Sequence, residues 1–154
     1  MATEFTLSDN VGKQQKEESK DEAHLVSTYP KTGFSHPPLF IALLKLYKQY
    51  YGLHQNLPKL FRVTVGEHIL LEMAEAMKLI VMANFNKKNP QRAEETAQMV
   101  LTLRGKIEVL KAYFLIGWEM KFISHGFYAL VNDKMEDISK QAYSWGALLE
   151  KQKK

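Results

Sequence analysis

Apolar residues recur at every third or fourth position through most of the chain after residue 38, and this spacing predicts helices. Short breaks separate four such segments, and no segment alternates apolar and polar residues as a half-buried strand does. The predicted helices span residues 39–55, 63–85, 91–122 and 126–151. Four helices joined by three short connections predict an all-α fold, an antiparallel up-down four-helix bundle.

The first predicted helix carries the clearest core stripe, which consists of Leu39, Leu43, Leu46 and Tyr50. Pro38 favours the start of this helix, because its missing amide proton is not needed in a first helical turn. The predicted helices also differ in length. The long third and fourth helices should therefore project beyond the first one or bend.

Particular residues in the second and third predicted helices indicate how these helices begin and how they pack. A basic connection, residues 57–62, precedes Thr64, which is predicted to be an N-cap in a capping box with Glu67. In the third helix, Leu101 is placed in the apolar stripe. Gly105 and Gly117 interrupt that helix at a cost of about 1 kcal/mol each relative to alanine, which indicates a bend or a close approach between helices.

The chain divides into two parts after residue 36. Residues 1–36 are polar and are predicted to form a disordered tail, because they cannot bury enough apolar area to offset the entropy of ordering. Residues 1–30 carry three lysines and six acids, a net charge of −3, whereas residues 31–154 carry 18 basic and 11 acidic groups, a net charge of +7. The bundle, residues 37–154, is thus a basic body that suits polyanions, and the acidic tail can compete weakly for the same surface.

Composition narrows the class of protein further. The 154 residues include no cysteine, which excludes disulfide scaffolds, thiolate metal sites and cysteine nucleophiles. No apolar run approaches the roughly 20 residues that span a bilayer. The beginning of the chain lacks the basic, apolar and small-residue pattern of a secretory signal. These features predict a soluble, cytoplasmic chain with no membrane contact.

Catalytic and metal-binding patterns are weak. Helical metal sites use Glu-x-x-His pairs, and the nearest substitute is His68 with Glu72 one turn later. No second helix supplies a matching set, so a carboxylate–histidine metalloenzyme stays a minor alternative. The glycines are isolated and form neither a nucleophile elbow nor a phosphate loop. We therefore expect no catalytic residue, no metal and no cofactor.

Cationic side chains are the remaining candidates for a functional site. Lysines neutralise phosphates without reading sequence, and arginines add forked contacts to phosphate or carboxylate. The predicted nucleic-acid-binding residues are Lys59, Arg62, Lys78, Lys87, Lys88, Arg92, Arg104, Lys106 and Lys111. The alternative is an ordinary solvated surface, in which Lys78 pairs with Glu75 or Glu72. In an oligomer, Arg104 could cross to the carboxylate of a neighbouring copy.

The aromatic side chains exceed what one bundle can bury. Adjacent pairs such as Tyr50–Tyr51 and Tyr113–Phe114 cannot both face the core. This excess indicates a protein–protein face, for self-association or for a partner.

Several segments together resemble a known family. Leu57, Pro58, Lys59, Arg62, Thr64, Gly66 and Ile69 match the pattern LPK-x-x-R-x-T-x-G-x-x-I. Leu103 and Arg104 match the family's third helix, and ISKQAYSW, residues 138–145, lies where the family has an isoleucine-to-tryptophan stretch near the end of its fourth helix. Tyr143 and Ser144 depart from the glycines that the family has there. The chain, over residues 39–150, resembles Avd, the accessory variability determinant of diversity-generating retroelements, which is related to the ribosomal intervening-sequence proteins.

The resemblance implies a non-enzymatic subunit that assembles as a homopentameric barrel of four-helix bundles. It also implies two kinds of partner, a reverse transcriptase and RNA or DNA, during the mutagenic cDNA synthesis that diversifies a target gene. Catalysis would then belong to the transcriptase. The alternative is a stand-alone bundle of the intervening-sequence type, an interaction module with no transcriptase partner. A reverse-transcriptase gene and a template/variable repeat pair nearby would distinguish the two.

Overall fold

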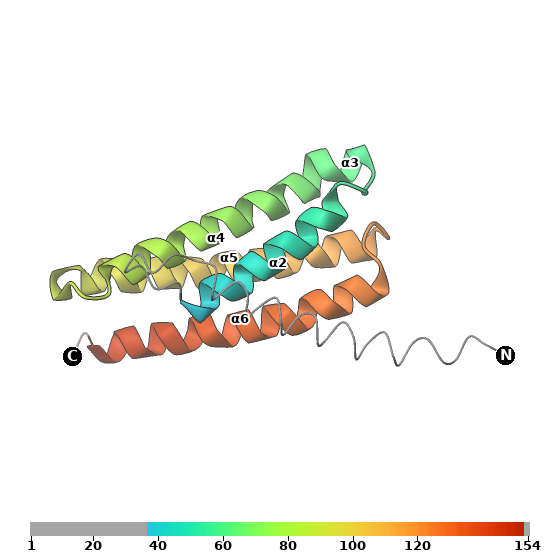
Figure 1. Cartoon of the computed structure of the whole chain (residues 1–154). Helices are drawn as coiled ribbons and strands as arrows, with labels where there is room; N and C mark the ends of the chain where they lie inside the picture. The colour runs from blue at the N-terminus through green and yellow to red at the C-terminus, as the bar shows by residue number, and fades with distance from the viewer. Residues whose placement is uncertain (1–36, 153–154) are drawn as a thin grey trace, which may run out of the picture. The chain divides into compact units, whose positions relative to one another are not determined.

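The computed structural model describes residues 37–152, so the predicted tail over residues 1–36 lies outside the described residues. Four long helices make up most of the described chain (Figure 1), and this part contains no strand. They are α2 (Pro38–His54), α4 (Glu67–Asn86), α5 (Ala93–Glu119) and α6 (His125–Gln152). The prediction of an all-α fold with four long helices, consistent with a helical bundle, is confirmed for residues 37–152.

Short helical elements occupy two of the breaks between these helices. One three-residue α-helix, α3 (Lys59–Phe61), runs into a π-helix, η1 (Arg62–Gly66), which continues directly into α4. A 3₁₀ turn, η2 (Pro90–Arg92), leads into α5. Lys59 and Arg62 therefore lie in helical turns and not in an irregular connection.

Each long helix contributes one face to a common core. α5 packs against both α4 and α6, and α2 packs against the same two helices. In α2, the buried residues are Leu39, Leu43, Leu46 and Tyr50, which confirms the predicted stripe. Burial of each such large apolar side chain favours folding by about 1.5–3 kcal/mol. The core is therefore the main source of stability for the bundle.

Two details of the predicted helices are wrong. Thr64 is no N-cap, because its hydroxyl donates a 2.6 Å hydrogen bond back to the Leu60 carbonyl, as threonine does inside helices. The helical backbone has already begun at Lys59. Leu101 is not in the core either: it is 56% exposed, and Leu103 takes the buried position.

The connection from α5 to α6 depends on a close approach at Gly117. A Cβ atom at Gly117 would lie 2.6 Å from Ile123 Cδ1 and 3.2 Å from Phe61 Cζ. Lys121 has a left-handed backbone with φ 64°, and the Ser124 hydroxyl accepts a 3.2 Å hydrogen bond from the Phe127 amide. The close approach expected of a helix glycine is thus found at Gly117.

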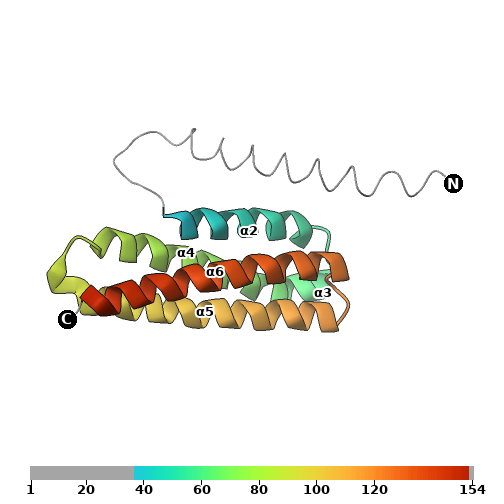
Figure 2. The ribbon, with the colours of Figure 1, turned by 90° about the horizontal axis from the view of Figure 1, so that it is seen from below.

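The helices differ in length, as the sequence predicts. α2 has 17 residues, whereas α5 has 27 and α6 has 28, and Figure 2 shows α5 and α6 continuing past the start of α2. The end of the bundle that α2 does not reach has a small core of its own. It is formed by Ala83, Ala97, Val100 and Leu149, and Trp145 packs against it.

Candidate nucleic-acid interface

The loop cations fall into two groups at opposite ends of the bundle. Lys59 and Arg62 lie in α3 and η1 at one end, while the turn between α4 and α5 lies at the other (Figure 1). This turn holds Lys87 and Lys88 and leads into Arg92. The structure therefore does not bring these cations together within one copy of the chain.

The turn between α4 and α5 presents its cations to solvent. Lys87, Lys88 and Arg92 are all exposed. The Asn89 side chain accepts a 3.1 Å hydrogen bond from the Gln91 amide and holds the turn. Arg92 lies 4.0 Å from Glu95 in an exposed pair, which contributes little. Lys87 and Lys88 have no acidic partner among residues 37–152, so their charge remains available to a ligand.

Lys106 does not extend this positive surface. Its ammonium lies 3.1 Å from Glu72 and 2.5 Å from Glu75 across the α4–α5 contact. The hydrogen bond from Lys106 and its charge lower the pKa of Glu75, and the hydrogen bond to Glu75 is the largest cause of the raised pKa of Lys106. Lys106 thus joins two helices.

Lys111 has a similar role between α5 and α6. Its ammonium lies 3.1 Å from Glu108 and 3.4 Å from Glu136, and it donates a 3.3 Å hydrogen bond to Ser139. Burial opposes the charged form, but the hydrogen bonds and charges of Glu108 and Glu136 outweigh it and raise the pKa of Lys111. Lys78, in contrast, is exposed on α4.

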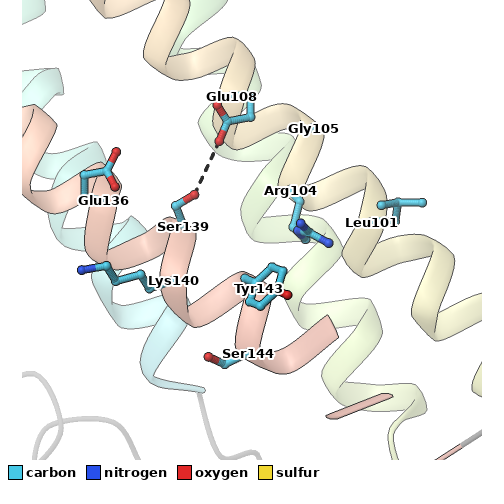
Figure 3. Close-up of a pocket in the computed structure, with 9 residues that line it drawn as sticks. All are labelled: Leu101, Arg104, Gly105, Glu108, Glu136, Ser139, Lys140, Tyr143 and Ser144. Carbon is cyan, nitrogen blue, oxygen red and sulfur yellow. Dashed lines mark hydrogen bonds between the residues drawn. The ribbon is translucent and has the colours of Figure 1, made fainter. Parts of the chain in front are cut away.

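Arg104 lies in a groove between α5 and α6. Its guanidinium carbon is 4.8 Å from the centroid of the Tyr143 ring, a cation–π contact, and Figure 3 shows the two side chains next to each other. The groove has a volume of about 560 Å³, and Glu108 and Glu136 line it together with Lys140. Two acids and two bases therefore face this groove, which does not favour a polyanion.

A second concave site lies where α2 begins, and we call it the α2 hollow. Its volume is about 450 Å³. It is lined by Pro37, Pro38, Leu39, Asn84, Lys87, Lys140, Gln141, Ser144 and Trp145. Sequence reasoning passed over Lys140. The four-residue spacings from Lys140 to Ser144 and from Gln141 to Trp145 were the available signal, because each places two residues on one side of α6.

At the end of the bundle that holds α3 and η1, polar side chains lie close together around Gly66. Tyr50 and His54 share a 3.0 Å hydrogen bond between the phenol oxygen and Nδ1, and Gly66 is buried beside both rings. The Nε atom of Arg62 is buried without a hydrogen-bond partner. Burial, followed by the charge of Arg62, lowers the pKa of His54, and Glu67 partly opposes this.

We expect His54 to make the protein less stable in mild acid. Its folded-state pKa lies below the value of about 6.5 in an unfolded chain, so its contribution is present above pH 6.5 and is lost as the pH falls from there toward the folded-state value. Urea unfolding at pH 7.5, 6.5 and 5.5 should show a shallower pH dependence for His54→Asn than for the wild type. The exposed His125 supplies the control, His125→Asn. Equal slopes for His54→Asn and the wild type would contradict the prediction.

The alternative site classes find no support in the described part of the chain. No group of three His, Asp or Glu side chains that could hold a metal ion occurs in residues 37–152. The His68 ring stacks on Tyr113 at 5.8 Å between centroids, and Glu72 is paired with Lys106. None of the helices between residues 37 and 152 is long and apolar enough to cross a membrane.

Comparisons with known protein families, with curated proteins and with solved structures found no match for this chain.

Proposed function

We propose that this chain is a non-enzymatic accessory subunit that binds nucleic acid and a reverse transcriptase, as the Avd resemblance implies. In this proposal the protomer is an antiparallel up-down four-helix bundle and works in mutagenic cDNA synthesis, with catalysis left to the transcriptase. The helical bundle agrees with the architecture that the resemblance implies. The matched motif, residues 57–69, also covers the short helix α3, the π-helix η1 and the buried Gly66.

One observation carries the nucleic-acid part of the proposal, namely the exposed pair Lys87 and Lys88 at the turn between α4 and α5. Neither ammonium has a carboxylate partner within residues 37–152, whereas Lys106 and Lys111 are each matched by two carboxylates. Uncompensated lysines attract phosphates and release counterions on binding. Such a surface binds nucleic acid with little preference for sequence.

The outward face of α5 supports self-association. This face lies opposite the core and carries a line of exposed uncharged residues, Leu101, Gly105, Val109, Ala112, Ile116 and Met120. A continuous apolar line on a helix surface is typical of an interface. α4 also exposes Leu71, Met82 and Phe85. Two different apolar surfaces on one protomer suit a head-to-tail contact, which closes into a ring when the rotation allows it, and a homopentamer is one such ring.

Nucleic-acid binding is expected to weaken steeply with salt and to depend on the α4–α5 turn. For duplex DNA, each lost phosphate contact reduces the slope of log affinity against log salt by about 0.9. Fluorescence anisotropy with a labelled duplex at 50–200 mM salt should give a shallower slope for Lys88→Gln than for the wild type. The double variant Lys87→Glu/Lys88→Glu should lose most binding while it keeps its helicity and oligomer size.

The matched control for this experiment is Lys48→Gln, which removes one exposed positive charge from α2 and should leave the slope unchanged. An affinity that does not depend on salt would contradict the nucleic-acid proposal. Unchanged binding by Lys87→Glu/Lys88→Glu would exclude this turn as the binding surface.

Binding of a reverse transcriptase distinguishes the proposed accessory subunit from the alternative, a stand-alone interaction module. Sequencing of the DNA that flanks the gene should reveal a reverse-transcriptase gene and a template/variable repeat pair. Co-purification of that transcriptase with the chain would then support the complex. Flanking DNA without either feature would favour an interaction module of the intervening-sequence type.

A further inference from the structure

The α2 hollow exists because α2 is the shortest of the four long helices. α2 has 17 residues against 20, 27 and 28 in α4, α5 and α6. α2 begins at Pro38, and α5 and α6 continue past this point (Figure 2), so α2 does not cover them there. The resulting volume of about 450 Å³ lies in the range of about 300–1,000 Å³ that is usual for small-ligand sites.

Among the described residues, the charges around the α2 hollow have one sign. Lys87 from the end of α4 and Lys140 from α6 line it, and no aspartate or glutamate of residues 37–152 does. The α5–α6 groove differs, because Glu108 and Glu136 line it. In Figure 3 the Lys140 side chain extends away from Arg104 and Tyr143. Of the two concave sites, the α2 hollow is therefore the one that suits an anionic ligand.

The walls of the α2 hollow supply a flat aromatic surface. Trp145 is half-buried, and it packs against the small core at the end of the bundle that α2 does not reach. Pro37 and Pro38 supply further apolar surface, while Gln141 and Ser144 supply polar groups. An indole that lines the same hollow as two lysines is the combination that proteins use for single strands, where bases stack on aromatic rings and cations follow the backbone.

We propose that the α2 hollow binds one nucleotide of a single-stranded nucleic acid, with the base on Trp145 and the adjoining phosphates on Lys87 and Lys140. This inference rests on the proposed nucleic-acid function and adds the location of the site and the strandedness of the ligand. A duplex does not fit the same site, since its bases are already stacked and paired and cannot lie against the indole.

Intrinsic fluorescence can report on this site directly. The chain has two tryptophans, and Trp118 stacks on Tyr128 with 4.8 Å between ring centroids. In a full-length Trp118→Phe variant, Trp145 is the remaining reporter. A 12-nucleotide oligothymidine should quench its emission, whereas a 12-base-pair duplex and polyglutamate at equal charge should not. Quenching by polyglutamate as strong as by oligothymidine would overturn the proposal in favour of an acidic peptide ligand.

Single substitutions in the otherwise wild-type chain then measure what Trp145 and Lys140 each contribute to oligothymidine binding. Trp145→Leu should weaken oligothymidine binding by about 5- to 150-fold, the range expected for loss of one stacked base. Because Trp145 is half-buried and its loss can disturb folding, the exposed Lys140→Gln gives an independent measurement. It should reduce the salt slope for the single strand by about 0.7, and Lys48→Gln should not change it.

The outcomes separate this inference from the function on which it rests. Failure of the wild type to bind any nucleic acid at low salt would refute the proposed function itself. Salt-dependent binding with no quenching, and with unchanged affinity for folded Trp145→Leu and Lys140→Gln, would overturn the α2 hollow alone. Weaker binding of the single strand with unchanged duplex binding would support it.

Discussion

Alanine at Gly66 is expected to lower the free energy of unfolding by up to about 2 kcal/mol, because overpacking outweighs the gain in helix propensity. Its Cβ would lie 2.9 Å from both the Tyr50 phenol oxygen and His54 Cε1. Tyr50 is fully buried, so its ring cannot move aside without disturbing the core. Overpacking costs about 1–3 kcal/mol, and alanine returns only about 1 kcal/mol of helix propensity.

The chain contains a matched control for this substitution at Gly52, which is exposed on α2. A Cβ atom there meets nothing within 4 Å, so Gly52→Ala should raise the free energy of unfolding by about 0.5–1 kcal/mol. Urea unfolding followed by circular dichroism at pH 7.5 measures both variants. Equal stabilisation by the two substitutions would show that the rings around Gly66 yield easily, and it would contradict the close packing of this site.

Glutamate at Ile116 is expected to break the self-association that we propose for the chain. Ile116 lies on the outward face of α5 and is 39% exposed, so a charge there is tolerated in the monomer. In an interface the same carboxylate would be buried without a partner, which costs several kcal/mol. Multi-angle light scattering should therefore report an oligomer for the wild type and a monomer for Ile116→Glu, with unchanged helicity.

Leu130→Glu tests whether any added charge has this effect. Leu130 is 37% exposed on α6, nearly the same fraction as Ile116, but lies away from the outward face of α5. This variant should keep the wild-type mass. Dissociation by both variants would point to general destabilisation, and an intact oligomer of Ile116→Glu would remove the outward face of α5 from the interface. A monomeric wild type would refute the homo-oligomer.

Local pattern was enough to predict the helices and much of the core. The spacing of Leu39, Leu43, Leu46 and Tyr50 allows a single buried face, and the same four residues are buried in α2. It failed at Thr64, because a hydroxyl near a helix start can serve either as a cap or as a donor to the preceding turn. Leu101 was misplaced for a related reason, since apolarity alone does not distinguish a core face from an apolar outer face.

The candidate site was less accessible to sequence reasoning, because pairing between helices decides which charges remain available. Lys106 is 34 residues from Glu72 and 31 from Glu75, and no local spacing relates them. The α2 hollow was missed because it arises from a difference in helix length and not from a motif. Lys87 and Lys88 could be identified, since they lie in a short turn where no carboxylate is near in sequence.

The π-helix at Arg62–Gly66 affects how this chain should be aligned with others. A π turn holds one more residue than the α turn it replaces, so loss of one residue between positions 62 and 66 would leave a regular helix. The segment before it would then rotate relative to α4, carrying Lys59 and Phe61 to a different side. Related chains that are one residue shorter at this point should therefore align with a gap between positions 62 and 66. In such chains, the lysine that corresponds to Lys59 should lie on a different side of the α4 axis.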